Sequence, residues 1–84
     1  MLRVLFFASI RERLGQASLL LEAPVVQSSV RDLINRLDAQ EFPGCAALLE
    51  ADNTLVAVNR EVVDAQHALA DGDEIAFYPP VTGG

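Results

Sequence analysis

The chain has 84 residues, 51% of them hydrophobic and 21% charged, which is typical of one small folded domain. Twelve acidic residues against six arginines and no lysine give a net charge of −6, which argues against binding to nucleic acid or anionic membranes and excludes lysine-based Schiff-base or P-loop chemistry. One cysteine, Cys45, and the lack of a signal-peptide or membrane-spanning pattern indicate a cytoplasmic protein.

The first third of the chain predicts two strands connected through a helical turn. Residues 2–8 are rich in strand formers and alternate between two faces. The buried face is expected to hold Leu2, Val4, Phe6 and Ala8, and the wetter face Arg3, Leu5, Phe7 and Ser9. A turn of helix over 11–14 is expected to stop at Gly15, and a second strand over 17–23 to end before Pro24.

Residues 29–40 carry the clearest helical pattern. Apolar residues at i, i+3, i+4 and i+7 form one stripe, made of Val30, Leu33, Ile34 and Leu37. Ser29 is a good N-cap, and Asp32 three residues later makes a variant of the capping box. The Phe-Pro-Gly sequence at 42–44 ends this segment, and a short helical turn is expected over 46–49.

The second half of the chain predicts further strands separated by turns. A strand over 55–58 leads through a turn at Asn59-Arg60 into 62–63, and Asp71-Gly72-Asp73 is a second turn signal. In the last strand, over 74–78, the inward residues are Ile75 and Phe77 and the outward residues are Glu74, Ala76 and Tyr78. The order β-β-α-β-β predicts an α+β fold, a β-grasp or ubiquitin-like roll with a mixed sheet on one main helix. The domain covers 1–78, and a projecting C-terminal Gly-Gly tail covers 79–84.

The tail has the sequence Pro-Pro-Val-Thr-Gly-Gly. The two prolines cannot continue a sheet and favour a stiff, extended conformation. Gly83 and Gly84 have no side chains, so they form a thin end with a free α-carboxylate. A disordered terminus would have the same composition. The combination with a ubiquitin-like domain favours a tail that enters a narrow tunnel in another protein.

The stretch 77–84, Phe-Tyr-Pro-Pro-Val-Thr-Gly-Gly, resembles the C-terminal signature of the small, sulfur-carrying subunits of molybdopterin synthase. Residues 4–8, Arg11, Glu12 and residues 69–74 resemble the same family, so the likeness covers essentially the whole chain. Tyr78 stands where the family often has a second phenylalanine. Gly-Gly alone also ends thiamine-pathway sulfur carriers and ubiquitin-like modifiers.

This resemblance implies a function for the C-terminal carboxylate. A ubiquitin-activating-enzyme-like adenylyltransferase would use ATP to adenylate Gly84, and sulfur would then replace AMP to give a thiocarboxylate. The tail would enter the large subunit of the synthase and donate sulfur to cyclic pyranopterin monophosphate, two carriers per dithiolene. The family suggests a heterotetramer, with no stably bound cofactor in this chain. The catalytic side chains would lie on the large subunit, so only the complex would be an enzyme.

A candidate partner surface follows from the residues themselves. Leu5, Phe7 and Tyr78 lie on the wetter faces of two strands that neighbour each other in parallel in a β-grasp sheet. They are expected to form an exposed apolar patch beside the tail, extended by Val62. The further partner contacts are the tail residues Pro79, Pro80, Val81 and Thr82.

Three other functions fit parts of the sequence: a sulfur carrier for another product such as thiamine, a protein modifier joined to lysines through Gly84, and a binding module without chemistry. A nucleophile–base pair of Cys45 and His67 is disfavoured, because the two residues lack a diagnostic spacing. The acidic run 71–74 is expected to be a turn rather than a cation site. Arg11 and Arg13 either contact a partner or solvate a short helix.

Overall fold

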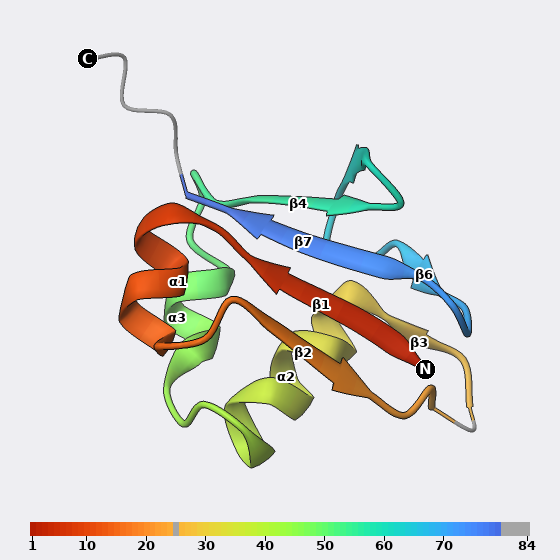
Figure 1. Cartoon of the computed structure of the whole chain (residues 1–84). Helices are drawn as coiled ribbons and strands as arrows, with labels where there is room; N and C mark the ends of the chain where they lie inside the picture. The colour runs from red at the N-terminus through yellow and green to blue at the C-terminus, as the bar shows by residue number, and fades with distance from the viewer. Residues whose placement is uncertain (25, 80–84) are drawn as a thin grey trace.

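The computed structural model of the chain describes residues 1–24 and 26–79, and Figure 1 shows the arrangement of its elements. The helices are α1 (Ala8–Leu14), α2 (Val30–Gln40) and α3 (Cys45–Leu49). The strands are β1 (Leu2–Phe6), β2 (Ser18–Leu21), β3 (Ser28–Ser29), β4 (Leu55–Val58), β5 (Glu61–Val63), β6 (Ala68–Leu69) and β7 (Glu74–Tyr78).

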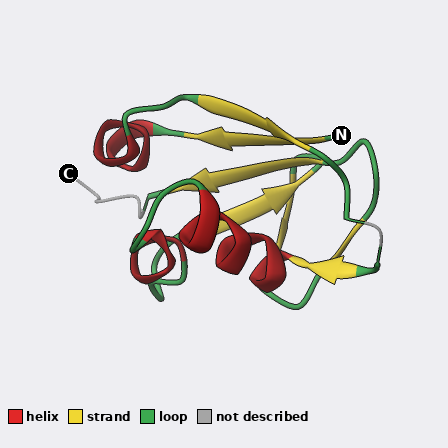
Figure 2. Ribbon diagram, turned by 90° about the horizontal axis from the view of Figure 1, so that it is seen from below, coloured by secondary structure: helices red, strands yellow, loops and turns green. Residues whose placement is uncertain are grey.

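Five strands form one mixed sheet in the order β2-β1-β7-β4-β5. The two central strands, β1 and β7, run parallel, and the other neighbours are antiparallel. Strands β3 and β6 form a separate two-stranded ribbon. Helix α2 packs across one face of the large sheet, and Figure 2 shows this two-layer arrangement from below. The predicted β-grasp fold is confirmed, with the two central strands bringing the N-terminal and C-terminal segments together.

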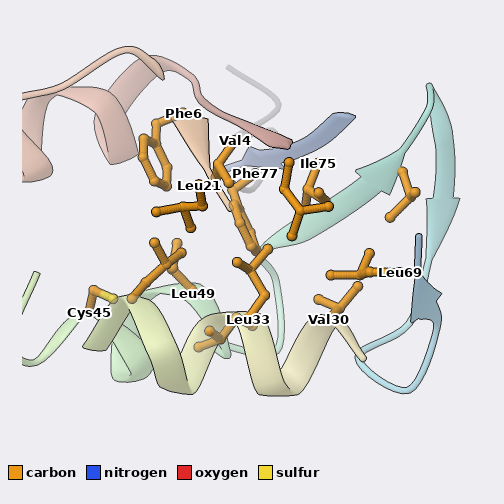
Figure 3. Packing of buried hydrophobic residues seen from close by; sticks show 14 of the residues in the cluster. Val4, Phe6, Leu21, Val30, Leu33, Cys45, Leu49, Leu69, Ile75 and Phe77 are labelled. Atoms are coloured by element: carbon orange, nitrogen blue, oxygen red, sulfur yellow. The ribbon is translucent and has the colours of Figure 1, made fainter. Parts of the chain in front are cut away.

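The core lies between α2 and the inner face of the sheet (Figure 3). Leu2, Val4 and Phe6 of β1 are buried, as the alternation predicts. From β7, Ile75 and Phe77 lie beside them and are fully buried. The Phe6 and Phe77 rings stack with a centroid distance of 6.0 Å. Apolar burial between the first and last strands therefore holds the two ends of the domain together.

Helix α2 forms for the reasons that its sequence indicates. The Ser29 side chain accepts a hydrogen bond from the Asp32 backbone N–H, and the Asp32 carboxylate accepts one from the Ser29 backbone N–H, which completes a capping box. The predicted stripe is buried in full: Val30, Leu33, Ile34 and Leu37. The helix ends before Phe42, whose backbone N–H donates to the Leu37 carbonyl.

The connection between β1 and β2 differs from the expectation. Ala8 was expected as the last inward residue of the strand, but it is exposed and begins α1, with φ of 50°. The backbone turns there because the Phe7 carbonyl accepts hydrogen bonds from the N–H groups of Ile10 and Arg11. Helix α1 is therefore longer than the predicted turn, although it ends as expected at Gly15, with φ of 72°. Strand β2 is shorter than the predicted range 17–23.

The predicted turn at Asn59-Arg60 is confirmed. Both residues have positive φ, 51° and 72°, the backbone that a tight two-residue hairpin turn requires. The Asn59 side chain accepts a hydrogen bond from the Glu74 N–H and donates one to the Asp73 carboxylate. These bonds attach the β4–β5 turn to the start of β7, at the end of the sheet away from Tyr78.

Candidate docking site and tail root

The sheet face that α2 does not cover carries a set of apolar side chains. Because paired residues of neighbouring strands point to the same face, the strand register orders this set into rows. One row crosses the sheet through Leu5, Ala76, Ala57 and Val62. A second row lies at the C-terminal end of β7 and holds Phe7, Tyr78 and Leu55. We call these seven residues the outer face.

The second row is the most ordered part of the outer face. The Phe7 and Tyr78 rings stack nearly parallel, with centroids 4.6 Å apart and planes 5° apart. Each residue remains more than a third exposed, and Leu55 beside Tyr78 is 44% exposed. Val62 is 68% exposed at the edge of the sheet. Large apolar side chains at this exposure on neighbouring strands are typical of a protein interface.

The structure brings the four residues of the predicted patch to one face of the sheet: Leu5, Phe7, Tyr78 and Val62. The sequence reasoning did not include Leu55, although alternation around the inward residues Val56 and Val58 would place it on this face. It also could not anticipate that Ala57 and Ala76 lie directly opposite each other at the centre.

The root of the tail begins where β7 ends. The Phe7 backbone N–H donates to the Phe77 carbonyl at 3.2 Å, so β1 holds β7 until the residue before Tyr78. Pro79 follows and is half-buried. Figure 1 shows that the C-terminal end of β7 lies beside α1 and far from the N-terminus. The remaining predicted tail residues, Pro80, Val81, Thr82, Gly83 and Gly84, lie outside the described residues.

Cys45 is a core residue at the start of α3. Burial, with a smaller contribution from the nearby Asp38 carboxylate, raises the pKa of its thiol to about 11. The thiol is therefore protonated at neutral pH, which disfavours a nucleophilic role. His67 is exposed in the turn before β6, where its backbone carbonyl accepts a hydrogen bond from the Val30 N–H.

The acidic run begins in a turn at Asp71-Gly72, as predicted, and Glu74 is the first residue of β7. The Asp73 carboxylate accepts hydrogen bonds from the Ala70 N–H and from Asn59. The Asp71 carboxylate pairs with the N-terminal ammonium, and this hydrogen bond lowers the pKa of Asp71. Across residues 1–24 and 26–79 no group of three or more potential ligands is placed to hold a metal ion.

The described part of the chain contains no helix with the length and apolar character to cross a lipid bilayer. Its longest helix, α2, has 11 residues and a polar outer side.

Comparison with known proteins assigns the family. The model of the ThiS family matches residues 4–84. The chain belongs to the ThiS family. The "Molybdopterin synthase sulfur carrier subunit" of Escherichia coli K12 is 43% identical over 84 residues and covers both chains completely. "Small archaeal modifier protein 3" of Haloferax volcanii is 35% identical over 92 residues, covering 99% of this chain and 98% of its own.

Solved structures of similar proteins share the fold of this ThiS-family chain. SAMP1 from Haloferax volcanii has a TM-score of 0.83 at 26% identity, over 99% of this chain and 98% of its own. A chain in the complex of subunits 1 and 2 of the molybdopterin-converting factor from Helicobacter pylori has a TM-score of 0.64 at 24% identity. The match covers 99% of this chain and 97% of that chain. The latter likeness shows the fold alone.

Proposed function

We propose that this chain is the sulfur-carrier subunit of a molybdopterin synthase. The observation that carries the proposal is the end-to-end match to the Escherichia coli relative of that name, within a chain that belongs to the ThiS family. The sequence supports it further, because Pro79-Pro80 and Gly83-Gly84 follow the last strand of a β-grasp sheet. A further support is that Pro79 directly follows Tyr78, whose ring is part of the exposed apolar outer face.

The proposed chemistry takes place at the Gly84 carboxylate. Gly83 has no side chain, so it keeps the chain narrow directly before this carboxylate. A carboxylate is a poor electrophile, so its oxygen first attacks the α-phosphorus of ATP, and pyrophosphate leaves. The resulting acyl-adenylate has AMP as a leaving group, and a sulfur nucleophile displaces it to give the thiocarboxylate. In the synthase the thiocarboxylate sulfur would bond to a carbon of cyclic pyranopterin monophosphate and displace an oxygen substituent there, and water would then cleave the acyl–sulfur bond and restore the carboxylate. Two such transfers supply the dithiolene.

The proposed partners divide these steps between them. A ubiquitin-activating-enzyme-like adenylyltransferase binds ATP and loads the tail, and the large subunit of the synthase accepts it, in a heterotetramer. The substrate is a phosphate anion and this chain has a net charge of −6, which favours a substrate pocket on the large subunit. The outer face is the proposed docking surface for that subunit, and both partners would work in the cytoplasm.

Sulfur loading is tested by mass spectrometry of the C-terminal peptide. Trypsin cleaves after Arg60 and releases residues 61–84, which contain neither methionine nor cysteine. After incubation with ATP, the activating enzyme and a sulfur source, we expect an oxygen-to-sulfur mass shift on this peptide. Deletion of Gly84 should abolish the shift while circular dichroism shows an intact fold. A shift that persists without Gly84 would refute the tail mechanism.

Docking is tested separately by substitution on the outer face. Phe7→Arg places a charge in the second row, and we expect the Kd for the large subunit to rise at least about 30-fold, as for a central interface residue. The arginine can stack on Tyr78, so the domain should remain folded. Val26→Arg is the control, because Val26 is 70% exposed and lies outside the outer face. An unchanged Kd for Phe7→Arg would refute docking through this face.

Protein modification is a second candidate, favoured by the 35% identical relative named as a small archaeal modifier. It would join the Gly84 carboxylate to a lysine amine through an isopeptide bond. In that case the peptide 61–84 should appear attached to lysines of other proteins in a lysate, and the products should form without a sulfur supply. Sulfur loading without such conjugates would exclude it.

A further inference from the structure

A groove of about 620 Å³ lies between α1 and α3, at the end of the sheet where β7 ends. Both views show these two helices at that end of the molecule (Figures 1 and 2). Its apolar lining includes Ile10 from α1 and Leu48 from α3, and Pro79 at the root of the tail also lines it. The groove is therefore continuous with the tail root. The outer face adjoins it through Phe7, which directly precedes α1.

Among the residues that the structure describes, Arg13 of α1 is the one charged residue that lines the groove. The other polar lining residues are neutral, namely Ser9, Asn53 and Thr54. Arg13 is exposed and forms no ion pair with any residue in the described ranges. In a chain with twelve acidic residues, the described lining of this groove presents one positive side chain and no carboxylate. Its shape and charge therefore fit an apolar segment with an acidic side chain.

We propose that this groove receives an extended apolar segment of the synthase large subunit, with an acidic side chain of that segment paired to Arg13. The inference rests on the proposed function and deepens it by adding a second contact surface. Phe7, Tyr78 and Pro79 lie at one end of the sheet and Pro79 lines the groove, so a protein that covers the two rings and encloses the chain from Pro79 would also reach the groove. A second copy of this chain is a poorer occupant, since each copy carries a net charge of −6.

The two surfaces would contribute differently to the complex. The outer face is apolar and would supply most of the affinity through burial. The Arg13 contact is charged and lies at an exposed position, so it would contribute mainly to partner selection and to the rate of association. This division predicts a salt dependence for groove variants that an uncharged truncation of the outer face, such as Phe7→Ala, would lack.

The groove is tested with the full-length carrier and the purified large subunit, by titration calorimetry at low and high salt. We expect Arg13→Gln to raise the Kd by about 3–5-fold, the size of an exposed ion pair, and Arg13→Glu by about 10-fold. Both effects should shrink at 1 M salt, where the Debye length falls to about 3 Å. Arg60→Gln and Arg60→Glu make the same charge changes in the β4–β5 turn, at the opposite end of the sheet, and should leave the Kd within about twofold.

A second pair of variants tests the groove without removing Arg13. Ala47 is exposed on α3 and lines the groove, so Ala47→Glu adds a carboxylate that would repel an acidic segment. We expect it to raise the Kd by about 5–10-fold. Ala39→Glu is the control, because Ala39 is exposed on α2 and does not line the groove. Circular dichroism and thermal melting check that each variant is folded.

The outcomes separate this inference from the proposed function. If Phe7→Arg weakens binding while Arg13→Glu and Ala47→Glu do not, the groove inference is wrong and the outer-face docking stands. If none of the three changes the Kd, the docking proposal itself fails. If Arg13→Glu leaves the Kd unchanged but alters thiocarboxylate hydrolysis or self-association of the isolated carrier, the occupant is the tail or a second copy, and the inference is overturned.

Discussion

The Phe7–Tyr78 ring stack should link stability and docking, and Tyr78→Ala tests it most directly. A buried tyrosine side chain covers about 150–250 Å². Tyr78 is 37% exposed, so roughly 100–150 Å² is removed from water. At about 25 cal/mol per Å² this corresponds to at most about 2.5–4 kcal/mol, and the compactness of the unfolded chain reduces it. We expect Tyr78→Ala to lower the free energy of unfolding by about 1.5–2.5 kcal/mol.

Urea denaturation followed by circular dichroism measures this loss, and a double-mutant cycle isolates the stack. Phe7→Ala and Tyr78→Ala should couple by about 0.5–1.5 kcal/mol, the energy of an aromatic pair. Phe7→Ala and Val62→Ala should be additive within about 0.5 kcal/mol, because Val62 lies on the edge strand in the other row. Tyr78→Phe keeps the ring and should change stability by less than about 0.5 kcal/mol. A loss below about 0.5 kcal/mol for Tyr78→Ala, or no coupling to Phe7, would refute this account of the tail root.

Three further predictions concern the helices. Gly15 and Ala8 both have positive φ, which favours glycine. Gly15→Ala should therefore lower the free energy of unfolding by about 1 kcal/mol, and Ala8→Gly should leave it unchanged or raise it by up to about 1 kcal/mol. Thermal melts that shift in the same direction for both variants would contradict this. Ser29→Ala should cost about 1 kcal/mol through loss of the cap, and Ser29→Asn should recover most of it in urea denaturation. The Cys45 thiol should resist alkylation at pH 8 until the protein unfolds. Because burial raises the pKa of this thiol to about 11, the buried, protonated thiol should contribute fully to the free energy of unfolding below about pH 9. That contribution should disappear as the pH rises through 11. Rapid alkylation of the folded protein would contradict the burial.

The sequence predicts the local elements well because neighbouring residues determine them. The Ser29 capping box, the apolar stripe of α2 and the Asn59-Arg60 turn each depend on a few adjacent positions, and each is confirmed. Gly15 ends α1 as expected for the same reason. Ala8 was misplaced because the strand pattern continues through it. The helix begins there because the Phe7 carbonyl accepts hydrogen bonds from the backbone N–H groups of Ile10 and Arg11.

The sequence also indicates the family and the proposed chemistry, because these reside in a contiguous tail motif. The match of the family model to residues 4–84 agrees with that interpretation. The residues of the proposed docking surface could be predicted from the sequence only in part. Leu5 and Tyr78 were found from strand alternation, since a two-residue period identifies one face without knowledge of the partner strand.

Only the tertiary structure decides which faces and helices lie side by side. Ala57 and Ala76 are opposite each other because β4 and β7 pair in one particular register, and a one-residue shift of β4 would direct Ala57 to the core. The groove beside Pro79 exists because α1 and α3, some thirty residues apart in the sequence, meet at the same end of the sheet. Such arrangements depend on long-range packing, whereas the caps, turns and tail are determined by residues a few positions apart.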